Sequence, residues 1–324
     1  MENRMIADLK NSYGLTCNQI TPVTGGLLNK KWKVSTDKGE LLIKQYSTKR
    51  FDRKNLELIE SRLQRQIFLQ KKGVPCPLLW QSGGQVICWL DEETVYMVME
   101  FCKGDIKNSD TISINQMYSL GGTCAVMHGA LSQLPQPLVK SLPHFGGYTL
   151  DSLWEKFRSR LNKCSPEDHS GYRQTLLALE PILKRLGPEF FDKFSKGYAH
   201  EDFHSGNILF NMECVSAVVD FDRNCWSYIL HDIGRAILSF ALEEDKMNIE
   251  KICAFQKGYS QYLAITLSDI VDALRLSWCI EIVWWIQPEF FEECDKTPKR
   301  FRDEMLWLTK HWFEMDLHIH TTGV

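Results

Sequence analysis

The sequence lacks the features that mark a membrane, secreted or fibrous protein. Its longest apolar stretch, Trp278 to Ile286, is interrupted by Glu281 and is far shorter than the roughly 20 residues that a helix needs to cross a bilayer. The first five residues lead into charged sequence without the apolar segment of a signal peptide. There is also no internal repeat and no low-complexity segment. We therefore expect a soluble, cytoplasmic protein that does not bind a membrane.

An excess of charge of one sign is also absent. The 38 Lys and Arg residues are balanced by 41 Asp and Glu residues, so the net charge is only −3. Such a chain has no global field that would attract nucleic acid. Apolar residues make up 44% of the 324 residues, which is enough for a large core, and the length exceeds what one ordinary domain needs. We expect a globular protein with two lobes that does not bind nucleic acid.

The cysteines show no pairing pattern. There are eleven of them, an odd number, and no two are spaced as Cys-x-x-Cys, the close pairing that zinc sites and redox motifs require. Most have apolar neighbours, as Cys88 does between Ile87 and Trp89. We expect free and mostly buried thiols rather than disulfides.

The periodicity of apolar residues changes near residue 100. The predicted elements before this point are strands at 31–35, 41–46, 85–90 and 94–101 and one long helix over 55–70. After residue 114 the pattern is mostly helical, apart from one hairpin within 207–221. The sequence therefore predicts a β-rich lobe over 1–103, a hinge at 100–104 and a larger helical lobe over 104–324.

The densest group of chemically active side chains lies just before and within this hairpin. Asp202 and Asn207 bracket a tight loop, and two apolar strands then return the chain to Asp220 beside Asn207. The arrangement collects a carboxylate for proton abstraction, with an amide oxygen and a second carboxylate for a hard cation such as Mg²⁺. Phosphoryl transfer needs a metal on the phosphates and a positioned base for the attacking hydroxyl. The pattern therefore favours phosphoryl transfer.

In this order, His200, Asp202, Asn207 and the segment 220–222 resemble the signature of the aminoglycoside phosphotransferase/choline kinase superfamily. The resemblance covers about residues 10–310. It implies an α+β, two-lobed protein-kinase-like fold, with a five-stranded antiparallel sheet and one helix before a mainly helical lobe. It also implies that ATP and Mg²⁺ are the cofactors and that the γ-phosphate goes to a hydroxyl of a small molecule. Asp202 would be the catalytic base, and Asn207 and Asp220 would hold Mg²⁺.

Further segments resemble parts of the family that bind the nucleotide or support the catalytic loop. They are Gly25, Gly26 and Asn29 of the nucleotide loop, the phosphate-binding Lys44, the hinge residues Glu100, Phe101 and Cys102 beside the adenine, and the supporting residues His200 and Asp232. ATP would then bind between the lobes.

Lys44 calls for a partner on independent grounds. It stands between apolar residues on a strand, where an unpaired ammonium is costly, unless it reaches solvent from an edge strand. On the helix over 55–70, Glu60 lies nearer the apolar stripe than Glu57 does. We therefore expect Glu60 to point inward and pair with Lys44.

Two positions depart from the family pattern. Glu201 stands where many relatives carry glycine, and Gly234 stands where alanine is more usual. A second carboxylate beside Asp202 could raise the pKa of that residue, but we expect the Glu201 side chain to point to solvent. We expect Gly234 to be harmless, and we expect His204 to be structural.

Two other functions remain open. In length, and in residues 219–222 and 231–235, the chain is most similar to the CotS-like kinase-fold proteins of bacterial spore coats. It could therefore act in the coat, with coat proteins as partners, either as a protein kinase or without catalysis. A metal-dependent phosphohydrolase is the other candidate, and its ligands would be His200, Asp202, His204, Asp220, His231 and Asp232. That function would leave Lys44 and the two glycines unused.

The acceptor is the least defined part of the prediction. Aromatic and acidic residues within 278–285 could hold an amine by cation–π and charge contacts. The helical spacing of Trp278, Ile282 and Trp285 is equally typical of an ordinary core. We expect a cationic hydroxyl compound of low molecular mass as the first candidate, and a protein as the second.

Overall fold

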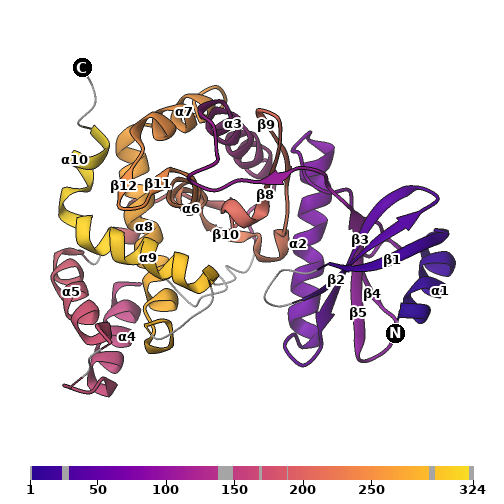
Figure 1. Ribbon diagram of the computed structural model, residues 1–324, viewed down its shortest axis with the longest axis horizontal. Coiled ribbons are helices and arrows are strands. Elements are labelled where there is room, and N and C mark those ends of the chain that lie inside the picture. The colour runs from indigo at the N-terminus through magenta and orange to yellow at the C-terminus, as the bar shows by residue number, and fades with distance from the viewer. Residues whose placement is uncertain are drawn as a thin grey trace. The chain divides into compact units, whose positions relative to one another are not determined.

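The computed structural model describes residues 2–23, 29–137, 149–167, 170–187, 189–291 and 296–320. Contacts divide the chain into two compact units (Figure 1). The first unit contains Met1–Asp105 and Ile208–Arg223, and the second contains Ile106–Asn207 and Asn224–Val324. None of the helices in these ranges combines the length and apolarity that a membrane span requires.

The first unit is built on a five-stranded sheet with the strand order β1-β2-β3-β5-β4. The strands are β1 (Cys17–Val23), β2 (Lys30–Thr36), β3 (Gly39–Ser47), β4 (Ile87–Trp89) and β5 (Thr94–Glu100). Every neighbouring pair is antiparallel. The predicted five-stranded antiparallel sheet is therefore confirmed.

The predicted long helix is α2 (Arg53–Lys71). It begins at Asp52, whose carboxylate accepts a hydrogen bond from the amide of Asn55 at 2.7 Å, as an N-cap residue does. The helix packs against one face of the sheet, where Leu56, Ile59 and Leu63 meet Tyr46, Val95 and Met97. This apolar stripe is the one that the sequence shows at helical spacing.

A second helix, α1 (Glu2–Tyr13), was not predicted. Its buried residues Met5, Leu9 and Tyr13 pack against the opposite face of the sheet, with Trp32 and Ile43 among their neighbours. Only one residue per turn of α1 is buried, so the apolar periodicity of this short segment is weak in the sequence. The sheet is therefore covered by a helix on both faces.

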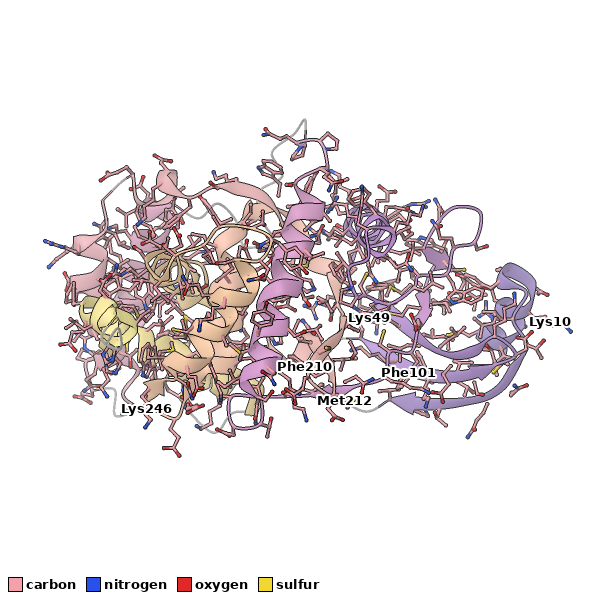
Figure 2. The ribbon with its side chains drawn as sticks, turned by 90° about the horizontal axis from the view of Figure 1, so that it is seen from above. Lys10, Lys49, Phe101, Phe210, Met212 and Lys246 are labelled. Carbon is pink, nitrogen blue, oxygen red and sulfur yellow. The ribbon has the colours of Figure 1, made fainter. Side chains whose placement is uncertain are left out.

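The hairpin of β8 (Ile208–Asn211) and β9 (Cys214–Val218) groups with the first unit. The amide of Val218 donates to the carbonyl of Pro75 at 2.7 Å, and Ser216 donates to the carbonyl of Lys103 at 3.0 Å. Figure 2 labels Met212 at the exposed turn of this hairpin. The sequence-based division at residue 103 placed the hairpin with the helical lobe, so the two divisions differ in this segment.

The second unit is mainly helical. Its α-helices are α3 (Ile114–Leu131), α4 (Leu150–Lys163), α5 (Tyr172–Arg185), α6 (Ile229–Ala241), α7 (Ile249–Tyr259), α8 (Leu267–Trp285), α9 (Lys296–His311) and α10 (Met315–His320). The short strands are β6 (Asp105–Ile106), where the chain passes from the first unit, the antiparallel pair β7 (Lys196–Ala199) and β10 (Cys225–Tyr228), and the pair β11 (Leu242–Glu243) and β12 (Lys246–Met247). Single 3₁₀ turns of this unit lie at Phe190–Lys193, Ser205–Asn207, Pro288–Phe290 and Trp312–Glu314, and one of the first unit lies at Phe221–Arg223. The short strands of this unit were not predicted, because two to four residues are too few for alternation to be visible.

Glycines set how closely the helices of the second unit approach one another. A Cβ atom on Gly121 of α3 would lie 2.0 Å from the carbonyl oxygen of Phe255 on α7. On α6, a Cβ atom on Gly234 would lie 2.3 Å from the carbonyl oxygen of Ala273 on α8. Alanine does not fit at either position without moving a helix, so glycine at position 234 suits the close packing of α6 against α8, which agrees with the expectation that glycine is harmless there.

We expect Gly121→Ala to lower the free energy of unfolding by about 1–3 kcal/mol, because the added methyl group overpacks the contact between α3 and α7. Gly129→Ala is a matched control on the same helix, since a Cβ atom there meets nothing within 4 Å. The control should be neutral or stabilising by up to about 1 kcal/mol through helix propensity. Urea unfolding of both variants measures the difference, and equal effects would contradict this account of the packing.

Candidate active site

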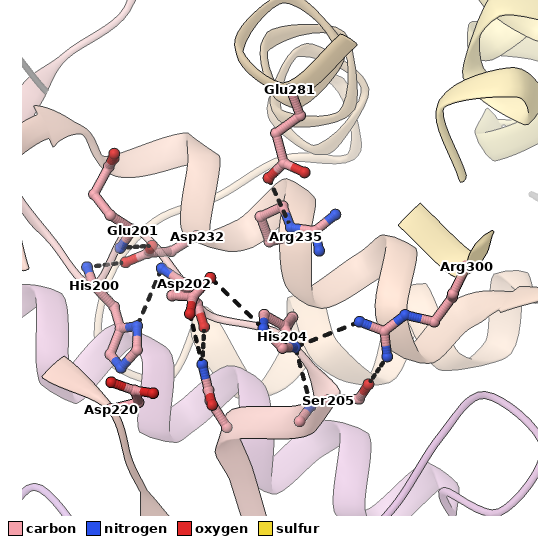
Figure 3. Close-up of polar contacts among 12 residues, drawn as sticks. His200, Glu201, Asp202, His204, Ser205, Asp220, Asp232, Arg235, Glu281 and Arg300 are labelled. Carbon is pink, nitrogen blue, oxygen red and sulfur yellow. Dashed lines mark hydrogen bonds and ion pairs between the residues drawn. The ribbon is translucent and has the colours of Figure 1, made fainter. Parts of the chain in front are cut away.

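A buried carboxylate holds the loop that carries Asp202. Asp232, in the first turn of α6, is fully buried and accepts hydrogen bonds from the backbone amides of His200 at 2.7 Å and Glu201 at 2.9 Å (Figure 3). It also accepts from Nε2 of His128 at 3.0 Å. Burial raises the pKa of Asp232, but His128 and the amide of His200 lower it more, so the net pKa lies below the ordinary value. Asp232 therefore supports the loop as an anion.

Asp202 and Asn207 are held together within this loop. Nδ2 of Asn207 donates to Oδ2 of Asp202 at 3.0 Å and to its carbonyl oxygen at 2.9 Å. The amide of Asp202 donates to Nδ1 of His200 at 3.2 Å. The Asp202 side chain is 25% exposed. One carboxylate is thus fixed in direction while part of it remains open to a ligand.

His204 is a neutral neighbour of this carboxylate. Its Nδ1 accepts a hydrogen bond from the amide of Gly206 at 3.1 Å, so the proton is on Nε2, which lies 3.6 Å from Oδ1 of Asp202. Burial, opposed by Asp202 and assisted by Arg235 and Arg300, lowers the pKa of His204 to about 4. His204 therefore turns an N–H toward Asp202 at neutral pH, and no sequence signal indicated this.

Glu201 is buried, which corrects the expectation that it points to solvent. Glu201 is 2% exposed, and its Oε1 lies 3.6 Å from Nδ1 of His231. The backbone φ of Glu201 is +66°, a conformation that glycine adopts more readily than other residues. The side chain belongs to a buried charge network.

The rest of this network connects α6 with α8 and α9. His231 donates from Nε2 to Glu281 at 3.0 Å, and Nε of Arg235 lies 2.9 Å from the same carboxylate (Figure 3). Arg235 also donates to Glu304 of α9 at 2.8 Å. Burial raises the pKa of Glu281, but Arg235 and His231 lower it to about 2. The helix that carries Glu281 also contributes Trp278 and Ile282. Both are buried, as expected if these residues form an ordinary core rather than an amine-binding site.

Lys44 lies in the first unit and is paired there with two carboxylates. Lys44 is 2% exposed, and its Nζ donates to Oδ1 of Asp220 at 2.8 Å and to Oδ2 of Asp222 at 2.7 Å. Tyr46 donates to the other oxygen of Asp222 at 3.0 Å, and Arg62 donates to its carbonyl oxygen at 2.7 Å. Burial lowers the pKa of Lys44, but the two aspartates raise it more, so Lys44 is charged. Asp222 belongs to the sequence motif, but the sequence alone predicts no role for it.

Glu60 does not pair with Lys44, so that prediction is wrong. Its carboxylate accepts from the amide of Ile87 at 2.7 Å and from the amide of Val86 at 3.1 Å. The neighbouring Glu57 is largely exposed and lies 3.6 Å from Arg53. Glu60 does point inward, but it caps the start of β4, because unpaired backbone amides there also need an acceptor.

The other residues predicted to bind the nucleotide are placed as follows. Gly25 and Gly26 lie outside the described residues. Asn29 lies just before β2, and its Oδ1 is buried without a hydrogen-bond partner in the described part of the chain. Glu100 ends β5, and the chain leaves the sheet at Phe101 and Cys102.

Comparison with known proteins agrees with this geometry. The model of the phosphotransferase enzyme family matches residues 19–265, which is well over half of the chain. The chain belongs to the phosphotransferase enzyme family. A homoserine kinase of Rhodopseudomonas palustris is 24% identical over 255 residues, which cover 78% of this chain and 73% of that protein. Seven further relatives, at 23% or 24% identity, are also homoserine kinases.

Solved structures of this family share the fold. An amicoumacin kinase in complex with AMP-PNP, Ca²⁺ and its ligand has a TM-score of 0.63 at 19% identity and covers 94% of both chains. A spectinomycin phosphotransferase with ADP and spectinomycin has a TM-score of 0.62 at 15% identity and covers 97% of this chain and 98% of that one. A microcompartment-associated aminopropanol kinase has a TM-score of 0.59 at 14% identity, with 97% and 98% covered.

These results confirm the kinase-like fold and the prediction of an ATP-dependent small-molecule phosphotransferase that acts on a hydroxyl group. The phosphohydrolase alternative is not supported. Among the described residues, the six side chains proposed as its ligands do not form a metal-ligand cluster. His200 and Asp232 instead serve the backbone of the loop.

The buried His231 gives a testable pH dependence. Burial lowers its pKa, but Glu201 and Glu281 raise it to about 9. Because the folded state holds this proton more tightly, the stabilisation is complete below pH ~6.5 and is lost as the pH rises through about 9. We expect the free energy of unfolding to fall over this range by at most roughly 3 kcal/mol from this residue. Urea unfolding across this range measures the fall, which should be smaller in His231→Gln; an unchanged pH dependence in the variant would show that other groups cause it.

Proposed function

We propose that this chain transfers the γ-phosphate of ATP to the hydroxyl of a small amino alcohol of the homoserine type, with Mg²⁺ as the metal. The main support for the proposal is the Asp202 carboxylate. It is fixed by Asn207 on the loop that Asp232 holds, and it is still partly exposed. The curated relatives that cover about three quarters of the chain are homoserine kinases, which supports a hydroxy amino acid as the acceptor.

Asp202 acts as the base that orients the attacking hydroxyl and accepts its proton. The hydrogen bond from Asn207 holds Oδ2, and we assign the attacking hydroxyl to Oδ1. His204 directs its Nε2–H toward Oδ1 and helps to keep the carboxylate ionised and aligned. Such positioning matters in phosphoryl transfer, where the transition state is loose and alignment supplies much of the rate.

The donor set in the chain fits a hard cation. Asn207 uses its amide nitrogen on Asp202, so Oδ1 is the atom left for a metal, and Asp220 offers a carboxylate that is 32% exposed. Amide and carboxylate oxygens of this kind are typical ligands of Mg²⁺ together with substrate phosphates. The metal would neutralise charge on the phosphates.

The nucleotide would be bound by residues of the first unit. Lys44 is charged and lies against two aspartates, and its ammonium would bind the phosphates of ATP. Oδ1 of Asn29, which has no hydrogen-bond partner among the described residues, would accept a hydrogen bond from the nucleotide. Glu100 pairs with Leu41 in the last residue pair of β3 and β5, and Phe101 and Cys102 follow it. The backbone at Phe101 and Cys102 would contact the adenine.

The spore-coat function stays a separate hypothesis, with coat proteins as partners. It does not follow from the comparisons, whose curated relatives are homoserine kinases. A coat component without catalysis would bind ATP weakly or not at all and would show no turnover.

Two substitutions separate proton transfer from metal binding. Asp202→Asn keeps the shape and the contact with Asn207 but removes the base, so turnover should fall by about 10²–10⁴ while ATP affinity stays nearly constant. Asp220→Ala removes a metal ligand and a partner of Lys44, so both nucleotide–Mg²⁺ affinity and turnover should collapse. Steady-state kinetics and ATP titration measure the two effects. Near-normal turnover of Asp202→Asn with its acceptor would show that Asp202 is not the base.

The acceptor class is tested by ATP consumption with purified protein. We expect turnover with L-homoserine and little with aminoglycosides, choline or protein extracts. ATP with Mg²⁺ should also raise the melting temperature, since a ligand at 100 times its dissociation constant stabilises by about 2.7 kcal/mol. Absence of stabilisation by ATP, together with no turnover on any hydroxyl compound, would favour a non-catalytic role.

A further inference from the structure

An arginine from α9 reaches the catalytic loop. Nη1 of Arg300 donates to Oγ of Ser205 at 2.6 Å, and Nη2 lies 3.4 Å from Nδ1 of His204 (Figure 3). The Arg300 side chain is 36% exposed, so the guanidinium is held beside the loop but is not enclosed.

The positive charge of Arg300 is poorly compensated. A guanidinium has five N–H donors, yet within the described part of the chain Arg300 makes one short hydrogen bond, which goes to the neutral hydroxyl of Ser205. Among the same residues its buried Nε has no hydrogen-bond partner; it lies 3.4 Å from Oε1 of Glu304, whose Oε2 accepts from Arg235 at 2.8 Å. Burial and the nearby Arg235 lower the pKa of Arg300, and Glu304, Glu281 and Asp202 oppose this without reversing it. An additional anion at Arg300 would offset the effect of burial and stabilise the charged form.

Arg300 lies close enough to Asp202 for one small acceptor molecule to contact both residues. His204 lies between them, with Nε2 3.6 Å from Oδ1 of Asp202 and Nδ1 3.4 Å from Nη2 of Arg300. One imidazole ring therefore separates the base from the guanidinium. A short carbon chain that places its hydroxyl at Asp202 can place a group at its other end near Arg300.

We propose that Arg300 binds the carboxylate of the acceptor, so that the chain phosphorylates hydroxy amino acids in preference to amino alcohols that lack a carboxylate. This inference rests on the proposed function. The planar fork of arginine matches a carboxylate with two parallel hydrogen bonds. An acceptor with an amine alone would gain nothing from Arg300.

A matched pair of acceptors tests the proposal. L-homoserine and 3-amino-1-propanol have the same hydroxyl, carbon spacing and amine, and differ by the carboxylate. We expect kcat/KM to favour L-homoserine in the wild-type protein. Arg300→Gln should raise KM for L-homoserine by about 10- to 100-fold, the worth of a charge-assisted hydrogen bond, and leave 3-amino-1-propanol and the KM for ATP within roughly 2-fold. Arg300→Lys should be intermediate, because it keeps the charge without the fork.

Lys299→Gln is the matched control. Lys299 is the neighbouring residue on α9, is 58% exposed and pairs with Asp303, so the substitution removes the same charge without touching the loop. It should leave the preference for L-homoserine unchanged.

Three outcomes would overturn the proposal. Equal use of both acceptors by the wild-type protein would show that no carboxylate is recognised. Equal loss of both activities in Arg300→Gln would show that Arg300 acts on the loop through Ser205. Turnover of neither acceptor would reject this acceptor class together with the role of Arg300, whereas the phosphotransferase assignment would still be judged separately by ATP binding and by turnover with the other hydroxyl compounds.

Discussion

The catalytic loop depends on the buried anion of Asp232. A carboxylate without solvent contact is costly unless its oxygens are hydrogen-bonded, and here the amides of His200 and Glu201 and the imidazole of His128 satisfy it. Because these amides belong to the residues just before Asp202, the same bonds that stabilise Asp232 set the direction of the loop. His128 is fixed in turn by Tyr259 at 3.0 Å, so helices α3, α6 and α7 all contribute to the position of one base.

Each unit contains its own group of paired charges. In the first unit, Lys44 pairs with Asp220 and Asp222, which lie after β9. In the second unit, the network of Glu201, His231, Glu281, Arg235 and Glu304 alternates in sign. Breaking such a buried pair by removing one partner leaves an uncompensated charge. The two groups are therefore constraints on sequence as well as parts of the candidate site.

The acceptor side is supported from another part of the chain. Arg300 contacts Ser205 and, with Arg235, is joined to Glu304 of the same helix. The residues that would select an acceptor thus lie on α9, whereas the base and its brace lie on the loop and on α6. This separation lets acceptor preference change by substitutions on α9 while the hydrogen bonds around Asp202 stay the same.

The sequence by itself determined four strands of the sheet, helix α2, the helical remainder, and the loop with Asp202 and Asn207, because local periodicity and close spacing along the chain carry that information. The fifth strand was expected only from the family resemblance. It could not determine partners across long separations. Lys44 has Asp220 and Asp222 as partners instead of Glu60, and Glu201 is buried against His231. Arg300 reaches a loop 95 positions earlier in the chain. Only the tertiary structure decided these contacts, since a buried charge pairs with whichever opposite charge the packing brings nearest, and sequence distance does not enter that energy.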